Sequence, residues 1–253
     1  MNISDIQQKL SSKILIFPHI PKTAGTTLRS VILSQYSQEK VHFLKVSQTP
    51  LEAAQKISEY DNKRVHCYVG HMPYGLHKYL AKPAIYITLI REPVDRIISM
   101  YYFIREEPAH RLHNEFLSKD ISLEDFVLSR NCPRNEQVKK IAGSMVGSAK
   151  ETMDLAYQNI CNHFLAVGTQ DNFDDFLQVL QNILGWKNKS YTKQKVTKNR
   201  KNKREVSQEL IDIIKQKNGM DIAFYNNLKN KFTIKNFDYI VSRTTSKFIK
   251  NEW

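Results

Sequence analysis

The feature that most constrains the fold is an uncharged run of seven residues at 84–90 (AIYITLI), which ends at Arg91. A short apolar run rich in β-branched and aromatic residues is typical of a strand buried on both faces, as in parallel sheets. Pro93 follows at the favoured first position of a helix, where Asp95 would lie near the positive end of the helix dipole. The sequence therefore predicts a buried strand followed directly by a helix over residues 93–104.

Strand patterns and helix patterns alternate along the rest of the chain. Further strands are predicted at residues 13–17, 64–69 and 164–167, and further helices at 26–36, 123–129, 171–184 and 207–218. The expected helix caps are Ser122 with Asp125, Ser207, and the C-terminal Gly185. Residues 1–12 are interpreted as a short helix or a loose arm, and 106–150 as helices with loops, while 233–253 stay unassigned. This alternation predicts an α/β fold with a central, mostly parallel sheet and helices on both faces. We interpret residues 1–253 as a single domain, because that length suits one full core.

Composition narrows the class of partner and the compartment. The chain carries 38 Lys and Arg against 25 Asp and Glu, a formal net charge of +13. This excess favours anionic partners without choosing among nucleotide, nucleic acid, glycan and membrane surface. Three cysteines, Cys67, Cys132 and Cys161, show neither CxxC nor Cys/His spacing, so we predict free thiols in a reducing compartment and no bound metal. Neither a signal peptide nor a run of about 20 apolar residues is found, so we expect a cytoplasmic protein without a membrane span.

The segment after the first predicted strand has the features of an anion-binding loop. This loop consists of Pro21, Lys22, Thr23, Ala24, Gly25, Thr26 and Thr27. It leads into a predicted helix, whose unpaired N–H groups and positive dipole end favour an anion. Gly25 would let the backbone approach a ligand closely, the threonines add hydroxyl donors, and Lys22 adds a mobile positive charge. Because the full G-x-x-x-x-G-K-[ST] signature is absent, an ordinary tight turn remains the alternative for this loop taken alone.

A second candidate anion site follows the strand at 84–90. Arg91 lies just past that strand, where a guanidinium can bind a phosphate through two parallel hydrogen bonds. Ser99 lies in the second turn of the next helix, from which its hydroxyl could reach the same phosphate. Arg96 is either a further contact or half of a structural ion pair, with Glu92 as the candidate partner, and we favour the structural role. Two anion cradles at two strand ends suit a nucleotide with phosphates at both ends of its ribose.

These two motifs, in this order, resemble the sulfotransferases that use PAPS (3′-phosphoadenosine 5′-phosphosulfate), specifically the branch that includes heparan sulfate 2-O-sulfotransferase and its bacterial relatives. Residues 19–28 (HIPKTAGTTL) resemble the 5′-phosphosulfate loop of that branch, and residues 89–102 (LIREPVDRIISMYY) resemble its 3′-phosphate motif. Weaker likenesses lie at 69–75 (VGHMPYG), 134–137 (RNEQ), 167–186 and 196–200 (VTKNR). The resemblance spans roughly residues 13–232 and implies a P-loop-like three-layer sandwich.

The resemblance also implies a reaction. An acceptor hydroxyl would attack sulfur in line, with the 5′-phosphate of the nucleotide as the leaving group and PAP (3′-phosphoadenosine 5′-phosphate) as the product. Residues 22–27 would bind the phosphosulfate, and Arg91 with Ser99 would bind the 3′-phosphate. Lys22 would stabilise the charge that builds on the leaving oxygen, and His71 would take the proton of the acceptor.

The likeness to the heparan enzyme is incomplete around the expected base. That enzyme carries His-Gly-His, whereas this chain has Val69 at the first position, so only His71 carries over. His19 is expected to brace the loop and His77 to line the acceptor cleft. The acceptor that the resemblance favours is a carbohydrate hydroxyl, ahead of a lipid, a small metabolite or a tyrosine.

Residues 187–204 form a basic tract with nine Lys and Arg in eighteen positions. One interpretation is a solvated loop, because runs of charge are often solvated. The other is a lid whose Thr197, Asn199 and Arg200 contact the nucleotide, and an anionic acceptor could also dock there.

Two other classes of protein remain as alternatives. A Mg²⁺-dependent P-loop kinase or nucleotidase would use an acidic residue at a strand end to hold the metal, but here the strand at 84–90 ends in Arg91. A non-enzymatic nucleic-acid-binding protein would explain the positive charge, but no RRM, KH or zinc-finger signature is found. The sequence predicts no oligomeric state.

Overall fold

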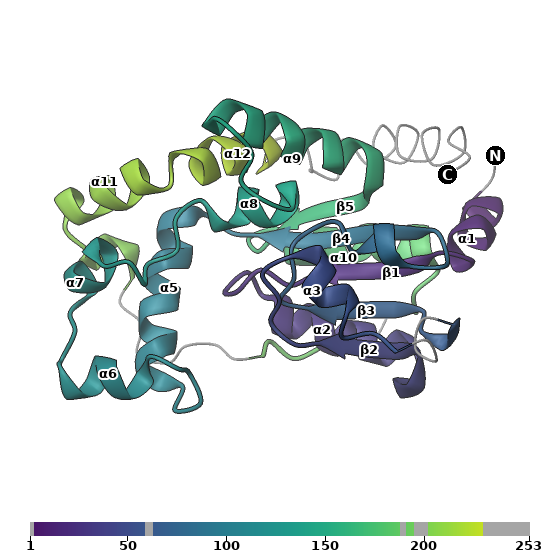
Figure 1. The fold of residues 1–253 in the computed structure, drawn as a ribbon, viewed down its shortest axis with the longest axis horizontal. Coiled ribbons are helices and arrows are strands. Elements are labelled where there is room, and N and C mark those ends of the chain that lie inside the picture. Colours follow the sequence, from purple (N-terminus) through teal and green to yellow (C-terminus); the bar gives the residue numbers. More distant parts are fainter. Residues whose placement is uncertain (1–2, 59–62, 188–190, 195–201, 230–253) are drawn as a thin grey trace.

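The computed structural model describes residues 3–58, 63–187, 191–194 and 202–229. A five-stranded sheet with the order β2-β3-β1-β4-β5 forms its centre, and every described strand pairing is parallel (Figure 1). The strands are β1 (Ile14–Pro18), β2 (Val41–Leu44), β3 (Cys67–Gly70), β4 (Ala84–Ile90) and β5 (Phe164–Thr169). The predicted central, mostly parallel sheet is therefore confirmed.

Helices cover both faces of this sheet. One face packs against α1 (Ile3–Ser11), α2 (Gly25–Gln35) and α10 (Phe173–Leu184). The other packs against α3 (Pro50–Ala54), α8 (Glu136–Ala142), α9 (Ala149–His163) and α12 (Gly219–Lys229). Short 3₁₀ turns lie at η1 (Gln38–Lys40), η2 (Leu76–Tyr79) and η3 (Lys203–Glu205). This arrangement gives the three layers that the sequence predicts.

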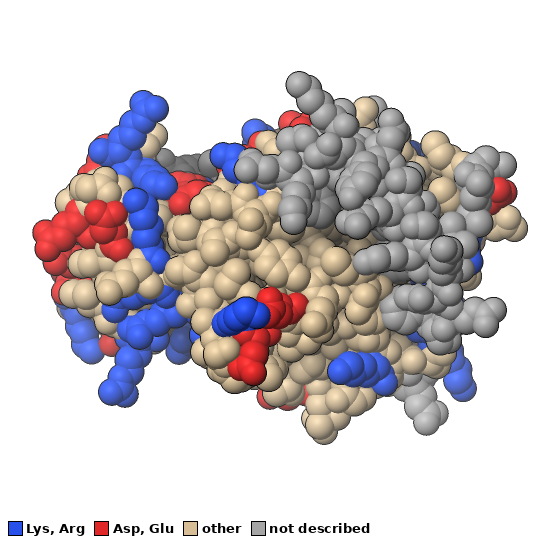
Figure 2. All heavy atoms as spheres, turned by 90° about the horizontal axis from the view of Figure 1, so that it is seen from above, with Lys and Arg blue, Asp and Glu red and all other residues tan. Residues whose placement is uncertain are grey.

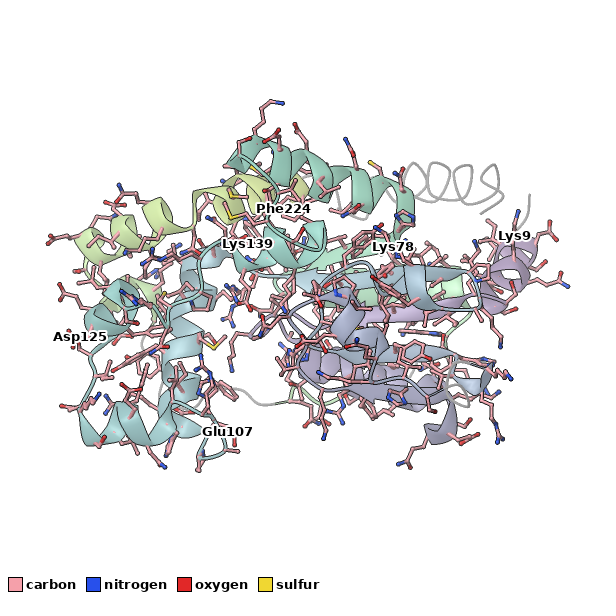
Figure 3. All side chains as sticks on the ribbon, in the orientation of Figure 1. Lys9, Lys78, Glu107, Asp125, Lys139 and Phe224 are labelled. Atoms are coloured by element: carbon pink, nitrogen blue, oxygen red, sulfur yellow. The ribbon has the colours of Figure 1, made fainter. Side chains whose placement is uncertain are left out.

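The residues of β1 divide between the two cores in strict alternation. Leu15 and Phe17 belong to the core on the α2 side, whereas Ile14 and Ile16 belong to the core on the α9 side. Successive side chains of a strand point to opposite faces, so a strand that is apolar at every position must be buried on both. The Phe224 ring of α12 illustrates the second core, where its centroid lies 5.1 Å from that of Tyr157 on α9 (Figure 3).

A third apolar cluster lies beyond the carboxyl end of β4. It joins α5 (Pro93–Glu106), α6 (His113–Ser118), α7 (Leu123–Leu128) and α11 (Gln208–Lys217). The rings of Phe116 and Phe126, from α6 and α7, meet edge to face with centroids 5.6 Å apart. Because α5 also follows directly from β4, this cluster fixes the helix that carries Arg96 and Ser99 against the sheet.

The predicted helix ends are confirmed where the sequence offers a cap. Ser122 and Asp125 form a reciprocal capping box, and the Ser207 hydroxyl accepts from the Leu210 N–H. Pro93 occupies the first turn of α5. Gly185 ends α10 with a φ of 66°, a left-handed conformation that glycine adopts without a steric penalty.

Three of the elements that the sequence did not predict are β2, α9 and α12. β2 has only four residues at the edge of the sheet, too few to show a clear period. α9 buries the small or polar Thr152, Ala156 and Asn159, so its apolar stripe is weak in the sequence. The capping box of Ser148 and Glu151 is the signal that could have located α9. α12 follows α11 almost directly and was not predicted.

The outer surface and the thiols bear on the expected partners and compartment. On the face shown in Figure 2, basic and acidic side chains are interspersed at the α7–α11 end, and the middle is largely uncharged. Cys67, Cys132 and Cys161 are all free. None of the helices in the described ranges is long and apolar enough to cross a membrane. The cytoplasmic location and the single domain stay predictions.

Candidate active site

A cavity of about 910 Å³ opens at the edge of the sheet where the parallel strands end. β1, β3, β4 and β5 all end here, and the residues that follow each of them line the cavity. In the sheet, β2 and β3 lie on one side of β1, and β4 and β5 lie on the other. The direction in which successive strands are added therefore reverses at β1. Ligands of open α/β sheets bind at such a switch point.

The loop after β1 has a backbone suited to an anion. Lys22 and Ala24 have φ values of 68° and 66°, while Thr23 between them does not have a positive φ. Alternation of this kind turns successive N–H groups toward one point and forms an anion-binding nest. The loop then enters α2 at Gly25, whose helix N-terminus adds its own unpaired N–H groups.

Gly25 is required by a neighbouring ring. A Cβ atom at this position would lie 2.0 Å from Cδ2 of His19, an impossible contact. His19 also stacks on Phe17, with ring centroids 5.6 Å apart. The His19 ring therefore packs directly on the loop backbone, in keeping with its predicted bracing role.

The three threonines of the loop face different surroundings. The Thr23 hydroxyl is fully buried and donates to the Ile20 carbonyl at 2.8 Å, so it stabilises the turn. Thr27 Oγ1 accepts from the Gln194 N–H at 3.0 Å. Thr26 lines the cavity, and its hydroxyl has no partner among the described residues. Thr26 and Thr27 both line the cavity, whereas Thr23 does not.

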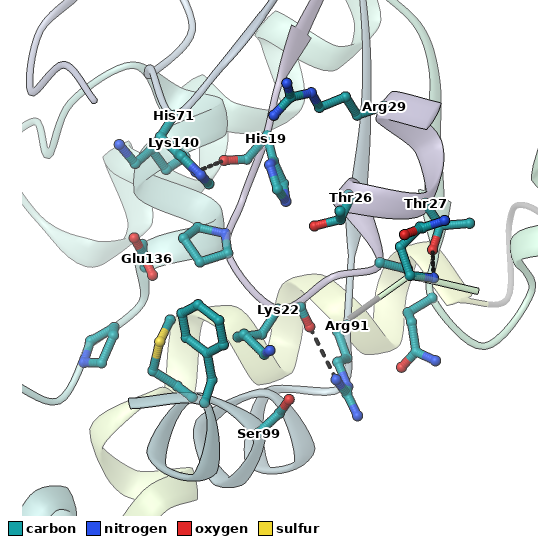
Figure 4. Close-up of a pocket in the computed structure, with 18 of the residues that line it drawn as sticks. His19, Lys22, Thr26, Thr27, Arg29, His71, Arg91, Ser99, Glu136 and Lys140 are labelled. Atoms are coloured by element: carbon teal, nitrogen blue, oxygen red, sulfur yellow. Dashed lines mark hydrogen bonds between the residues drawn. The ribbon is translucent and has the colours of Figure 1, made fainter. Parts of the chain in front are cut away.

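Arg91 joins the two predicted cradles. Its Nε donates to Asp95 Oδ2 at 2.7 Å, and Nη1 donates to the Lys22 carbonyl at 3.2 Å (Figure 4). Burial lowers the pKa of Arg91 to about 10, with Asp171 opposing that effect, so the guanidinium is charged at neutral pH. Ser99 lines the same cavity and is 2% exposed. The structure thus brings Arg91 and Ser99 to the loop that carries Lys22.

Gln137 is a site-supporting residue that the sequence reasoning left without a role. Its amide group binds the Arg91 backbone on both sides, accepting from the N–H at 2.8 Å and donating to the carbonyl at 3.0 Å. The side chain is 1% exposed. The N–H groups of Gln137 and Val138 both donate to the buried carboxylate of Asp221, which holds the start of α8. The likeness of residues 134–137 (RNEQ) to a segment of the family was the sequence signal from which a role for Gln137 could have been predicted.

The predicted partner of Arg96 is wrong. Arg96 pairs with Glu136 through Nη1 and Oε2 at 2.7 Å, not with Glu92. Glu92 accepts from the Asp95 N–H as the cap of α5 and pairs with Lys203. Arg96 is fully buried, and its Nε and Nη2 have no hydrogen-bond partner within the described ranges. Arg96 thus keeps the favoured structural role with another partner, because the start of α8 places the Glu136 carboxylate against its guanidinium while the Glu92 carboxylate caps α5.

His71 presents one ring nitrogen to the cavity. Its Nδ1 lies 2.8 Å from the His19 carbonyl oxygen (Figure 4). A carbonyl can only accept, so Nδ1 carries the proton and Nε2 is left with a free lone pair in the neutral ring. Burial lowers the pKa of His71, and the bond to the His19 carbonyl partly opposes this. His71 is therefore unprotonated at neutral pH, as a general base must be.

The other two histidines are less suited to act as the base. Burial, with His71 next in importance, lowers the pKa of His19 to about 3, which makes its ring a weak proton acceptor. His77 does not line the cavity, contrary to the prediction. Its ring packs instead on Tyr74, Tyr86 and His163, and Nδ1 lies 2.9 Å from the Tyr86 hydroxyl. The cause is the η2 turn, which directs His77 into the core.

The lowered pKa values of His19 and His77 predict how the stability of the folded protein depends on pH. Burial lowers the pKa of His19 to about 3 and that of His77 to about 4, from 6.5 in the unfolded chain. The folded state then binds fewer protons below pH 6.5, so we expect the free energy of unfolding to fall from pH 6.5 toward pH 4. One proton corresponds to at most about 1.4 kcal/mol per pH unit, and partial exposure reduces this. Urea denaturation at several pH values checks the slope, and His77→Gln should flatten it. An unchanged slope in His77→Gln would show that this ring is not the cause.

The basic tract is only partly described. Thr197, Asn199 and Arg200 lie outside the described residues, so their predicted contacts with a nucleotide stay predictions. Two described points of the tract contact the rest of the chain near the site: the Gln194 N–H donates to Thr27 of the loop, and Lys203 Nζ lies 3.2 Å from Oε2 of Glu92, which follows Arg91. Tyr191, Lys193 and Gln194 line the cavity.

Further residues line the same cavity. Among those that the sequence reasoning did not single out are Glu136, Lys139, Lys140, Phe103 and His110. Across the described residues, no three His, Cys, Asp or Glu side chains gather in a way that could hold a metal ion.

Together the fold and the site define an α/β protein that can hold an anionic nucleotide at its strand ends, beside a neutral imidazole. The profile of the sulfotransferase family matches residues 11–227. Human heparan sulfate 2-O-sulfotransferase 1 is 26% identical over 195 residues, covering 68% of this chain and 54% of that protein. The heparin sulfate O-sulfotransferase of Drosophila melanogaster is 24% identical over 194 residues, with 68% and 56% covered. The chain therefore belongs to the sulfotransferase family.

The chain spans about half the length of the curated relatives that it matches. Among solved structures, that of mouse sulfotransferase SULT7A1 complexed with PAP aligns over 86% of this chain and 70% of that chain, with 14% identity and a TM-score of 0.36. Family membership favours neither the kinase nor the nucleic-acid-binding alternative.

Proposed function

We propose that the protein transfers a sulfuryl group from PAPS to an acceptor hydroxyl, and that the acceptor is a carbohydrate. The observation that carries this proposal is the meeting of two anion cradles and one neutral imidazole on a single cavity. The nest at 22–24 with the start of α2 suits the phosphosulfate, and Arg91 with Ser99 suits the 3′-phosphate. The carbohydrate acceptor rests on the relatives, two of which are named as heparan or heparin sulfotransferases.

In the proposed reaction the acceptor hydroxyl forms a bond to sulfur as the bond from sulfur to the 5′-phosphate oxygen breaks. His71 Nε2 takes the hydroxyl proton, which its fixed tautomer allows. Lys22 and the loop N–H groups stabilise the negative charge that develops on the leaving phosphate. Arg91 keeps the 3′-phosphate in place and, through the Lys22 carbonyl, keeps the loop in register with it. The acceptor oxygen gains the sulfuryl group as its proton passes to His71. PAP leaves with the electron pair of the broken bond between sulfur and oxygen.

This proposal predicts that PAP stabilises the folded protein and that Arg91→Ala largely removes the effect. A ligand at a hundredfold excess over its Kd adds about 2.7 kcal/mol, or roughly 5–10 °C in Tm for a chain of this size. Arg91 holds a phosphate that does not react, so its loss should raise KM for PAPS with kcat nearly kept. Thermal melts with and without PAP, and steady-state kinetics, provide the measurements.

The matched control is Arg105→Ala, at the other end of α5, where the side chain bonds to Tyr101 and Asp120. Arg105→Ala should respond to PAP as the unmodified protein does. The absence of any shift at millimolar PAP in the unmodified protein would count against the proposed function. A normal KM with a collapsed kcat in Arg91→Ala would reject the role given to Arg91.

A further inference from the structure

The side chain of Lys22 is held on an aromatic ring that lines the same cavity. Its Nζ lies 4.1 Å from the centroid of the Phe103 ring, over the face of that ring. An ammonium group within about 6 Å of a ring centroid is attracted by the negative face of the π system. Figure 4 shows Lys22 directed toward α5, where Ser99 also lies.

The position of Phe103 on α5 indicates what this contact does. Phe103 follows Ser99 by four residues, so the two lie on the same face of the helix, one turn apart. Both line the cavity. Ser99 lies toward the Arg91 end of α5, whereas Phe103 lies farther along, where its ring meets the His110 ring edge to face at 5.8 Å. The ring face therefore holds the ammonium one turn beyond the predicted phosphate contact.

We propose that Phe103 is a positioning residue that docks the Lys22 ammonium in the nucleotide-free protein and releases it when a nucleotide binds. The proposal rests on the function given above, because the competing ligand is the 5′-phosphate of PAPS or PAP. A phosphate in the nest at 22–24 offers full negative charge, which attracts an ammonium more strongly than the quadrupole of a ring does. The docking contact is lost on binding, so it lowers nucleotide affinity and keeps the cation away from the loop until the phosphate arrives.

This inference predicts that Phe103→Leu binds PAP more tightly. Leucine fills a similar volume without a π face, so the contact that competes with PAP disappears. A cation–π contact of about 0.5–2 kcal/mol corresponds to a two- to thirtyfold gain in affinity, measured by isothermal titration of PAP. Phe103→Tyr keeps the ring face and should bind PAP as the unmodified protein does.

A double-mutant cycle separates docking from a general change in packing. In a Lys22→Ala background, Phe103→Leu should leave PAP affinity unchanged, because there is no ammonium to dock. If Phe103→Leu raised the affinity for PAP in both backgrounds, the proposal would be overturned. Equal or weaker binding of PAP by the Phe103→Leu single variant would also overturn it.

A second measurement does not depend on PAP affinity. With lysines carrying ¹³C-labelled methyl groups, the Lys22 signal, identified by its loss in Lys22→Ala, should be shifted upfield by the ring current of Phe103. It should return to the ordinary lysine position in Phe103→Leu and, in the unmodified protein, on saturation with PAP. An ordinary position in the free protein, or a signal that stays shifted with PAP bound, would overturn the docking role. Failure of the unmodified protein to bind PAP would instead reject the proposed function, while the signal of the free protein would still report on the docking contact.

Discussion

Lys22→Ala is expected to lower kcat for sulfuryl transfer by at least about 10²–10⁴-fold, with a much smaller effect on the affinity for PAP. Lys22 is the first residue of the nest and has a left-handed conformation, and its carbonyl is bound by Arg91. Negative charge reaches the leaving oxygen only as the bond to sulfur breaks, so a cation there stabilises the transition state more than the ground state. Single-turnover kinetics with saturating PAPS measure the loss.

Lys45→Ala is a suitable control for this change, because Lys45 is an exposed lysine that does not line the cavity. It should retain the rate of the unmodified protein. A Lys22→Ala protein that kept its kcat and lost only PAPS affinity would show that Lys22 is a binding residue alone.

His71→Ala is expected to lower kcat by about 10²–10⁴-fold and to change the pH profile. Nε2 must be unprotonated to take the acceptor proton, so the rate should fall on the acid side. Burial lowers the pKa of His71, which moves this fall to a pH below the ordinary histidine value of about 6.5. Removal of the ring should erase the acid limb. Rates between pH 4.5 and 8, with stability checked at each pH, provide the test.

His66→Ala provides the histidine control, since His66 lies at the opposite end of β3 and does not line the cavity. It should keep both the rate and the acid limb. If His71→Ala retained near-normal activity and the same profile, another group would be the base. His19 and His110 are then the histidines left on the cavity wall, and the pKa of about 3 makes His19 a weak base.

Much of the fold could be predicted because a strand that is buried on both faces is apolar at every position, and such a run is easily recognised in the sequence. The uncharged run at 84–90 became β4, and Pro93 opened α5 as expected. β2 left no such signal, because an edge strand of four residues is exposed on one side and carries the polar His42 in its middle. Local chemistry fixes strands and helix ends, whereas a short edge strand depends on the sheet that receives it.

The site could be predicted in its parts but less well in its contacts. Lys22, Gly25, Thr26, Arg91, Ser99 and His71 all line one cavity. The internal bonds were not readable from sequence: the Thr23 hydroxyl serves the turn, and Arg96 pairs with Glu136 from a helix forty residues away. Gln137 binds the Arg91 backbone across a similar separation. Such partners depend on tertiary packing, which no local pattern encodes.

The most direct test of the central claim follows the sulfuryl group itself. PAPS labelled with ³⁵S would be incubated with the protein and a panel of glycans, with lipid, small-metabolite and tyrosine acceptors alongside, and the products separated from free sulfate. The proposed function predicts label in a carbohydrate product, formed in step with PAP and lost in both Lys22→Ala and His71→Ala. Label in none of the acceptors, together with no stabilisation by PAP, would contradict it.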